Sequence, residues 1–311
     1  MIRVAVLIPC RNEEVAIPSV IAGFRTALPE AVVYVYDNNS TDSTAAVARA
    51  AGATVRFESL QGKGNVVRRM FADIEADAYI LVDGDDTYDP SAAPEMLRLL
   101  REQQLDMVTA SRVTEISAAY RRGHQTGNYV LTWIVRTLFG DRVSDMLSGY
   151  RAFSRRFVKS FPALSTGFET ETEFTVHALE LAMPVGEVEA PYKDRPVGSA
   201  SKLRTYTDGI RILRTIILLV KEVRPLQFFF AGALVLGLLA IALGAPIVTT
   251  FIATGLVPRL PTAVLATALV GLAALSTTCG LILDSVARGR KEQKRMAYLS
   301  IPAIGADQRS S

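Results

Sequence analysis

Two long stretches without a charged residue constrain this chain most. They run from Leu226 to Ile252 and from Leu260 to Leu283, and each exceeds the roughly 20 apolar residues that span a bilayer as a helix. A short loop with Pro258, Arg259 and Pro261 separates them. The pattern predicts a two-helix transmembrane hairpin rather than a pair of buried core helices, because uncharged runs of this length are uncommon in soluble domains.

Basic residues on both sides of this hairpin predict its orientation. Lys221 and Arg224 precede the first stretch, and five basic residues follow the second between positions 288 and 295. Cytoplasmic loops carry an excess of lysine and arginine. We therefore expect a two-span protein of the cytoplasmic membrane with its N-terminal domain and both termini in the cytoplasm, and a basic cytoplasmic tail over residues 288–311.

The composition excludes several classes of site. Half of the 311 residues are hydrophobic, an excess concentrated in the two uncharged stretches. With only two cysteines, Cys10 and Cys279, and two histidines, His124 and His177, neither a disulfide framework nor a zinc or histidine-based metal site is expected. The net charge of +3 is too small to indicate nucleic-acid binding, whereas basic residues near the spans favour anionic lipid headgroups.

Apolar runs alternate with segments of helical period before the hairpin. This alternation predicts an α/β domain with a mostly parallel, Rossmann-like sheet covered on both faces. In such sheets, binding residues lie in the loops that follow the strands. The strands are expected at Arg3–Ile8, Val32–Tyr36, Thr54–Glu58, Ala78–Val82 and Met107–Ala110.

The fourth expected strand ends in the acidic sequence Asp83-Gly84-Asp85. Two carboxylates separated by a glycine suit a hard divalent cation that keeps several waters and holds substrate phosphates. An isolated Asp-Gly-Asp can also be an ordinary acidic loop between a strand and a helix. The residues of the neighbouring loops therefore decide between a cation site and an ordinary acidic loop.

Polar residues follow the first two strands as well. The loops read Pro9-Cys10-Arg11-Asn12-Glu13-Glu14 and Asp37-Asn38-Asn39-Ser40-Thr41-Asp42. The two glutamates could simply favour the start of the next helix, and Ser40 or Thr41 is expected to cap the helix after the second loop. Capping does not need Asp37, so its carboxylate could accept hydrogen bonds from a ligand such as a nucleobase.

The third loop reads Gln61-Gly62-Lys63-Gly64-Asn65. Its glycine spacing, and the missing hydroxyl after the lysine, exclude a P-loop. Glycines at a helix start allow close backbone approach, and Lys63 places a cation where a phosphate could bind. A solvated turn is the alternative. Four successive strand ends thus offer groups suited to a nucleotide.

Together these motifs resemble those of the inverting family 2 glycosyltransferases with the GT-A fold. Three later segments and the hairpin are similar to the polyprenyl-phosphate glycosyltransferases, the group that includes dolichyl-phosphate mannose and glucose synthases. The resemblance implies a GT-A domain over residues 1–203, with a nucleotide-sugar half over about 1–110 and an acceptor half over about 111–203. The three segments are Ser144–Arg151, Gly167–Glu171 and Arg195–Leu203.

The resemblance also implies roles on the donor side. Asp37 would contact a uracil or guanine base. Asp83 would lie near the ribose, and Asp85, with Asp83, would hold Mg²⁺ or Mn²⁺ bridging the diphosphate of a nucleotide sugar. The other residues expected to bind the nucleotide sugar are Pro9, Arg11, Glu13, Lys63, Gly84 and Arg195.

On the acceptor side, a phosphate monoester is anionic and needs fixed cations, for which arginine is suited. Arg112 and Arg122 are the candidates, unless they are surface charges. The loop Arg195–Leu203 resembles one that closes over the diphosphate and excludes water. It adds Ser199 and Lys202 to the expected phosphate contacts.

Asp145 occupies the family position beside the acceptor phosphate. A phosphate whose second pKa is about 6 is mostly dianionic at neutral pH, so Asp145 would orient or tune the nucleophile rather than act as a strong base. A helix cap, or an ion pair with Arg142 or Arg151, is the alternative. Glu169 and Glu171 resemble an acidic pair near the sugar, and both could instead favour a helix start.

Two helices are expected beside this site. Gly127–Phe139 carries an apolar face that belongs either to the core or to a lipid-contacting surface. Residues 204–224 have basic and apolar faces typical of a helix lying in the membrane interface. That helix would hold the active site at the height of the lipid headgroups.

The sequence therefore predicts an inverting, metal-dependent glycosyltransferase that acts on polyprenyl phosphate, either undecaprenyl or dolichyl phosphate, and forms a homo-oligomer. UDP-glucose is the first choice of donor, followed by UDP-N-acetylglucosamine and GDP-mannose. A processive polysaccharide synthase is the nearest alternative, but the Gln-x-x-Arg-Trp motif is absent around Trp133. A catalytically silent membrane scaffold is the alternative from another class, and the intact aspartates argue against it.

Overall fold

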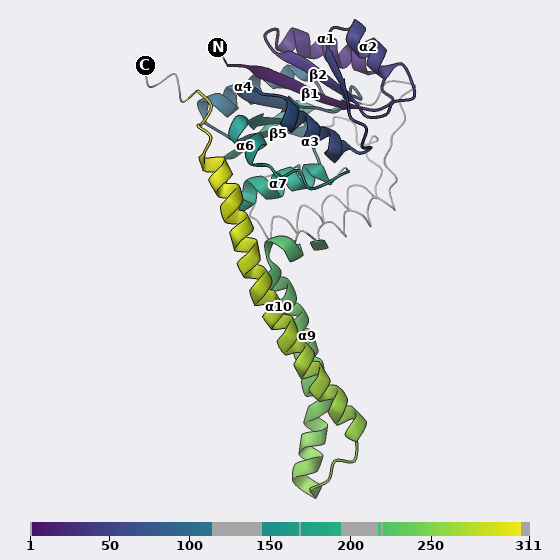
Figure 1. Ribbon diagram of the computed structural model, residues 1–311, viewed down its shortest axis with the longest axis vertical. Helices are drawn as coiled ribbons and strands as arrows, with labels where there is room; N and C mark the ends of the chain where they lie inside the picture. Colours follow the sequence, from purple (N-terminus) through teal and green to yellow (C-terminus); the bar gives the residue numbers. More distant parts are fainter. Residues whose placement is uncertain (1, 114–144, 168, 194–216, 219, 306–311) are drawn as a thin grey trace. The chain divides into compact units, whose positions relative to one another are not determined.

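A computed structural model of the chain describes residues 2–113, 145–167, 169–193, 217–218 and 220–305 (Figure 1). It divides into two compact units, Met1–Ile212 with Lys294–Ser311, and Leu213–Gln293. The predicted helix Gly127–Phe139 and most of the predicted interfacial helix lie outside the described residues.

The first unit is built on a seven-stranded mixed sheet with the order β3-β2-β1-β4-β6-β5-β7. All pairs are parallel except those of β6, which runs antiparallel to both β4 and β5. The fold class predicted from the alternation is confirmed, with β6 and β7 as strands that the apolar runs did not indicate. The strands are β1 (Val4–Cys10), β2 (Val32–Asp37), β3 (Thr54–Phe57), β4 (Ala78–Leu81), β5 (Met107–Val113), β6 (Arg151–Ser154) and β7 (Val185–Pro191).

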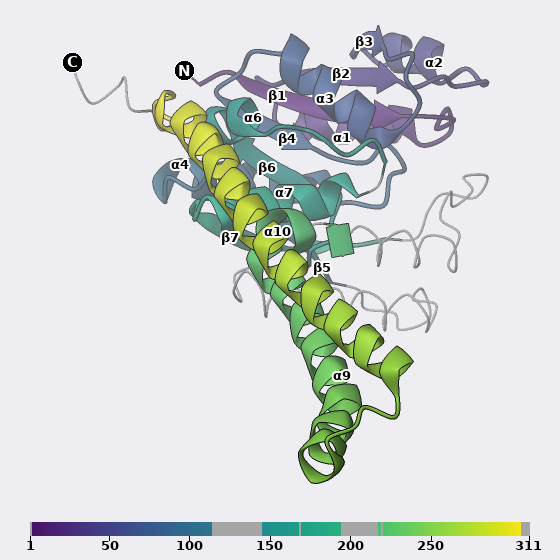
Figure 2. The ribbon, with the colours of Figure 1, turned by 60° about the horizontal axis from the view of Figure 1, so that its bottom comes forward.

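Helices lie on both faces of this sheet (Figure 2). Alternate residues of β1, β2 and β4 form a core cluster with buried side chains of α1, α2 and α4. Side chains from α3, α6 and α7 form an aromatic cluster with β4 and β6. The helices are α1 (Ile17–Ala27), α2 (Thr44–Ala50), α3 (Lys63–Asp73), α4 (Ala93–Glu102), which follows the 3-10 turn η1 (Pro90–Ala92), α6 (Arg155–Ser160) and α7 (Thr170–Glu180).

The aromatic cluster fixes α7 on the sheet. Phe153 of β6 stacks on Phe157 with ring centroids 4.5 Å apart, and Phe174 of α7 lies 4.9 Å from Phe153. Phe71 of α3 lies 6.1 Å from Phe174. Aromatic pairs at such separations add about 0.5–1.5 kcal/mol beyond their buried area. The start of α7, which carries Glu171 and directly follows Glu169, is therefore anchored by rigid packing.

His177 borders this cluster and is almost fully buried. Its Nε2 lies 3.1 Å from the Ser160 hydroxyl, and its Nδ1 has no hydrogen-bond partner among the described residues. Burial, with a smaller effect of the Lys294 charge, lowers the pKa of His177 to about 3. The imidazole is therefore neutral in the fold.

Acidification is expected to destabilise the domain through His177. The histidine pKa is about 6.5 in an unfolded chain, so below that pH the unfolded state binds a proton that the folded state refuses. The contribution of the neutral His177 to the free energy of unfolding is fully present above a pH of about 6.5. It is lost as the pH falls towards the folded pKa, by up to about 1.4 kcal/mol per pH unit. Thermal unfolding from pH 7 to pH 4 should show a smaller pH slope for His177→Gln than for the parent. Equal slopes would contradict this assignment.

The last residues of the chain also belong to the first unit. Tyr298 donates a hydrogen bond of 2.8 Å from its hydroxyl to the buried carboxylate of Asp106, and the Arg156 guanidinium lies 4.8 Å from the Tyr298 ring centre. Ile304 joins the hydrophobic core. Helix α10 (Leu260–Leu299) continues through part of the predicted basic tail at residues 288–311.

The second unit contains two long apolar helices, α9 (Pro225–Thr254) and most of α10. They lie side by side (Figures 1 and 2), and Ser276 donates a 2.9 Å hydrogen bond from its hydroxyl to the carbonyl of Phe229. A Cβ atom on Gly280 would lie 3.1 Å from the Cβ of Phe229, so a small residue permits this close approach. By length and composition, both helices are able to cross a membrane. This finding is compatible with the predicted membrane anchor.

Candidate active site

The carboxyl ends of β1 and β2 place the first two predicted loops together. The Asn12 side-chain oxygen accepts a 2.8 Å hydrogen bond from the Thr41 amide, and the Glu13 amide donates a 2.8 Å bond to the Thr44 hydroxyl. Helix α2 begins at Thr44 rather than directly after Ser40 or Thr41, and its first amide donates to Asp42. The expected cap by Ser40 or Thr41 is therefore wrong: the N-cap residue is Ser43, which makes no side-chain cap bond, and Asp37 takes no part in the helix start.

Asp37 is the last residue of β2 and is buried. Its Oδ1 has no hydrogen-bond partner among the described residues, although a buried polar atom without a partner is costly. A donor group of a ligand would satisfy it. Arg11, an exposed member of the neighbouring loop, faces the side-chain amide of Gln61 in the third loop.

Asn38 organises the third loop, a role that sequence reasoning missed. Its side-chain nitrogen donates to the carbonyls of Glu58 at 2.9 Å and Leu60 at 2.8 Å. Its side-chain oxygen accepts from the Gly62 amide at 2.7 Å. The available signal was an asparagine directly after a strand that ends in an acid, a residue type that readily bonds to loop backbone.

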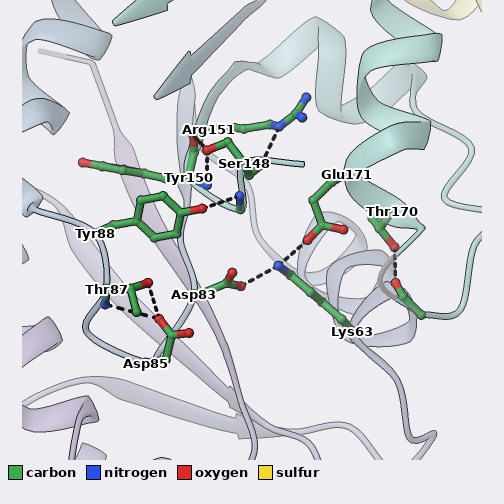
Figure 3. Close-up of polar contacts among 12 residues, drawn as sticks. Lys63, Asp83, Asp85, Thr87, Tyr88, Ser148, Tyr150, Arg151, Thr170 and Glu171 are labelled. Atoms are coloured by element: carbon green, nitrogen blue, oxygen red, sulfur yellow. Dashed lines mark hydrogen bonds and ion pairs between the residues drawn. The ribbon is translucent and has the colours of Figure 1, made fainter. Parts of the chain in front are cut away.

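Lys63 opens α3, and its ammonium group lies between two carboxylates (Figure 3). It forms ion pairs with Asp83 of the acidic motif and with Glu171 of α7. Burial lowers the pKa of Lys63, but the two carboxylates outweigh this and raise it above its ordinary value. The lysine is therefore firmly charged, and it links the nucleotide half of the domain to α7.

The glycines on either side of Lys63 admit another segment of the chain. Gly62 has a φ of +130°, and a Cβ there would collide with the carbonyl oxygen of Thr166. A Cβ on Gly64 would collide with the carbonyl oxygen of Ser165. The close backbone approach expected at this loop is thus made by residues 165 and 166, which lead to α7.

Asp83 and Asp85 lie at the end of β4, on either side of Gly84. Asp85 is buried, and its Oδ1 accepts hydrogen bonds from the Thr87 hydroxyl at 2.7 Å and the Thr87 amide at 3.3 Å. Within the described ranges, no group of three or more His, Cys, Asp or Glu side chains could hold a metal ion. Two carboxylates fit a hard cation that takes its remaining oxygen ligands from waters and phosphates.

Arg112 of β5 and Asp145 form a two-pronged ion pair. The Arg112 Nε donates to Oδ2 of Asp145 at 2.7 Å, and Nη2 donates to Oδ1 at 2.8 Å. The guanidinium carbon lies 5.5 Å from the ring centre of Tyr192. Burial would raise the pKa of Asp145, but hydrogen bonds and charge from Arg112, helped by the charge of Arg151, lower it below its ordinary value. Asp145 therefore stays ionised, which suits an orienting role.

The 145–149 loop, which follows from Asp145, brings this ion pair to the acidic motif. A Cβ on Gly149 would collide with Oδ2 of Asp83 and lie 3.2 Å from Nζ of Lys63. The Gly149 amide donates a 2.9 Å hydrogen bond to the hydroxyl of the buried Tyr88, which lies five residues after Asp83 in sequence. Asp83 of the predicted metal motif and the Arg112–Asp145 pair thus meet at one backbone segment.

Comparison with known proteins decides the family. Residues 5–161 match the family described as Glycosyl transferase family 2. The chain is 35% identical over 228 residues to glycosyltransferase AglJ of Haloferax volcanii, which spans 73% of this chain and 75% of that protein. The chain belongs to glycosyl transferase family 2. It is therefore a glycosyltransferase, as the motifs predicted.

The chain is also similar to a further curated protein and, in its fold, to a solved structure. The Haloferax volcanii dolichyl-phosphate hexose transferase is 28% identical over 221 residues, covering 71% of this chain and 95% of that one. The crystal structure of Mycobacterium tuberculosis glucosyl-3-phosphoglycerate synthase with Mn²⁺, UDP and phosphoglyceric acid has a TM-score of 0.56 at 22% identity, covering 71% of this chain and 78% of that chain. This likeness confirms the predicted GT-A fold.

The structure describes only some of the other predicted site residues of this family 2 glycosyltransferase. Glu169 precedes α7, and its Oε2 has no hydrogen-bond partner within the described part of the chain. Glu171 is buried and bound to Lys63, and burial outweighs the lysine charge to raise its pKa. Pro9 lies within β1 and Gly84 packs against Cys10 and Ile8. Arg122, Arg195, Ser199 and Lys202 lie outside the described residues.

Proposed function

We propose that this glycosyltransferase moves a sugar from a nucleotide diphosphate sugar to polyprenyl phosphate with inversion at the anomeric carbon. One observation carries the proposal. The 145–149 loop joins the Arg112–Asp145 pair, suited to an anionic acceptor, to Asp83 of the acidic motif, suited to a nucleotide diphosphate. The name of the archaeal dolichyl-phosphate hexose transferase supports the same acceptor class.

For the donor, the orphaned oxygen of Asp37 would accept a hydrogen bond from the nucleobase. The loops that contain Arg11 and Glu13 are bonded to the Asp37 loop and would surround the base. UDP-glucose is our first choice, and glucosyl-3-phosphoglycerate synthase has been crystallised with UDP-glucose and Mn²⁺. UDP-N-acetylglucosamine and GDP-mannose are the next candidates.

Asp85, with Asp83, would hold Mg²⁺ or Mn²⁺ against the diphosphate. When bound, such an ion neutralises charge that develops on the leaving nucleoside diphosphate. The protein's own contribution is to keep both carboxylates in place. Thr87 donates two hydrogen bonds to Asp85, and Lys63 binds Asp83. This prearranged geometry lowers the cost of organising the site at the moment of reaction.

The lipid phosphate would be the nucleophile in a single in-line displacement. One of its oxygens forms a bond to the anomeric carbon, the bond from that carbon to the diphosphate breaks, and the products are polyprenyl-phosphate sugar and nucleoside diphosphate. Arg112 would hold the acceptor phosphate, and Asp145 would orient Arg112 through both of its carboxylate oxygens. Positioning of the two reactants supplies most of the rate enhancement.

The two apolar helices would anchor this site in the cytoplasmic membrane. The basic residues on both flanks favour a cytoplasmic domain and cytoplasmic termini. A processive polysaccharide synthase of the same fold is the competing function. The missing Gln-x-x-Arg-Trp motif argues against it.

The proposal is tested with purified full-length protein in detergent, undecaprenyl phosphate, Mg²⁺ or Mn²⁺, and a panel of nucleotide sugars. Mass spectrometry of the lipid fraction should detect one sugar-phosphate-lipid, formed from one preferred donor and only with the cation. A long polysaccharide product would favour the synthase. Donor hydrolysis without a lipid product would retain the nucleotide site and overturn the acceptor.

A further inference from the structure

Arg151 is fully buried at the first position of β6. Its Nη2 donates to the carbonyl of Met146 at 2.6 Å. Its Nε donates to the carbonyl of Ser148 at 3.0 Å (Figure 3). Both carbonyls belong to the 145–149 loop. A single guanidinium therefore fixes the backbone of that loop at two points.

The same guanidinium reaches α7 on its other side. Nη1 donates to the Thr175 hydroxyl at 2.8 Å, and that hydroxyl donates to the carbonyl of Glu171 at 3.3 Å. The guanidinium carbon also lies 5.7 Å from the centre of the Phe174 ring. Arg151 thus connects the loop of Asp145 to the helical turn of Glu171.

These two carboxylates belong to the two charged clusters of the site. Asp145 holds Arg112 on the acceptor side, and Glu171 shares Lys63 with Asp83 on the donor side. Within the described part of the chain, Arg151 forms no ion pair itself. Taking an arginine out of water is costly unless its donors are satisfied, so three well-directed hydrogen bonds at this junction favour a dedicated role.

We propose that Arg151 is a positioning residue for sugar transfer: it holds the 145–149 loop against α7, so that the Arg112–Asp145 pair keeps its place relative to the Lys63–Asp83–Glu171 cluster. This inference rests on the proposed function. Arg151 touches neither reactant. It acts by fixing the separation between the group that holds the acceptor phosphate and the groups beside the donor diphosphate.

The role predicts a loss of turnover without a loss of donor affinity. In Arg151→Lys the ammonium keeps the charge, but it cannot direct donors to the Met146 carbonyl, the Ser148 carbonyl and Thr175 together. A displacement of the loop by about 1 Å is expected to lower kcat by roughly 10- to 100-fold. The KM for UDP-glucose and the calorimetric Kd for UDP should stay within about twofold of the parent, because Asp37 and Asp85 are untouched.

Arg156→Lys is the matched control. Arg156 is also an arginine that binds a buried group, since its Nε donates to Asp106 at 2.5 Å, but it lies outside the site. The Arg156→Lys variant should have a lower melting temperature than the parent and an unchanged kcat. Thr175→Val provides a milder second variant if Arg151→Lys does not fold, since it removes the hydroxyl that joins Arg151 to the Glu171 carbonyl and leaves the contact with Phe174. It should lower kcat several-fold at an unchanged UDP affinity.

Assays use full-length protein in detergent, with UDP-glucose, undecaprenyl phosphate and Mn²⁺. Loss of kcat with unchanged UDP affinity in the Arg151 or Thr175 variant, but not in Arg156→Lys, supports the positioning role. A lower melting temperature with unchanged kcat in the folded fraction would assign Arg151 to stability alone and overturn it. A raised KM for UDP-glucose at unchanged kcat would overturn it in favour of donor binding. A parent that forms no lipid product with any donor would overturn the proposed function, and this inference with it.

Discussion

Replacing Asp85 with asparagine is expected to lower sugar transfer by about 100- to 1,000-fold, the effect of losing one key electrostatic contact to a developing charge. Asparagine keeps the shape of the side chain, and its amide oxygen can still accept the two hydrogen bonds from Thr87. What it removes is the negative charge that would hold the divalent cation. The loss should therefore fall on turnover rather than on folding.

The measurement is the rate of lipid-linked product formation as Mn²⁺ is titrated, together with calorimetric binding of UDP in the presence and absence of Mn²⁺. The parent should bind UDP more tightly with the cation, and Asp85→Asn should show little of that gain. EDTA should bring the parent close to the activity of the variant. These three results together would link the activity to a cation at Asp85.

Asp89→Asn is the matched control for this substitution. Asp89 lies four residues further along the same loop, and its side chain caps η1 by accepting from the Ser91 amide at 2.9 Å. Asparagine is as good a helix cap as aspartate, so the control removes one carboxylate and preserves the local structure. Equal activity in the Asp85 and Asp89 variants would remove the metal site from the proposal.

Most of the sheet could be predicted from the sequence, because β1, β2 and β4 are short apolar runs that end in polar loops. β6 could not be predicted in that way. It has four residues and begins with the buried Arg151, so no apolar run marks it. Its antiparallel place between β4 and β5 depends on pairing between segments more than 40 residues apart in sequence, which local patterns do not encode.

The candidate site was predictable to the extent that polar residues follow strands. The loops with Asp37, Lys63 and Asp83 were chosen because the carboxyl ends of parallel strands share one edge of a sheet. The partners of these residues were not predictable. Lys63 pairs with Glu171, 108 residues away, and Asp145 pairs with Arg112, where the sequence suggests Arg142 or Arg151 as its partner. Such pairs join segments that are distant in sequence and meet only in the folded domain. The spacing of residues along the chain does not predict them.

Replacing Arg112 with lysine is expected to lower kcat/KM for the lipid phosphate by roughly 100-fold while donor binding is retained. A lysine ammonium is a point charge and cannot reproduce the planar fork through which Arg112 binds both oxygens of Asp145. The guanidinium held in this way would bind the acceptor phosphate, and losing a hydrogen bond to a charged group costs about 1.5–3 kcal/mol, where about 1.4 kcal/mol corresponds to tenfold. Initial rates at varied undecaprenyl phosphate, with calorimetric binding of UDP, measure the two effects separately.

Arg155→Lys controls for the change of side chain. Arg155 forms a 3.3 Å ion pair with Glu75, and both side chains are largely exposed, so its replacement should leave both constants unchanged. A loss of UDP affinity in Arg112→Lys would move Arg112 to the donor site, and unchanged kinetics would make it a structural partner of Asp145 only. The expected pattern separates these cases because, among the described residues, the 145–149 loop brings the Arg112–Asp145 pair to Asp83 of the donor cluster. A lower kcat/KM for undecaprenyl phosphate with an unchanged UDP affinity would therefore show that the acceptor half and the donor half bind their substrates separately, although they lie next to each other.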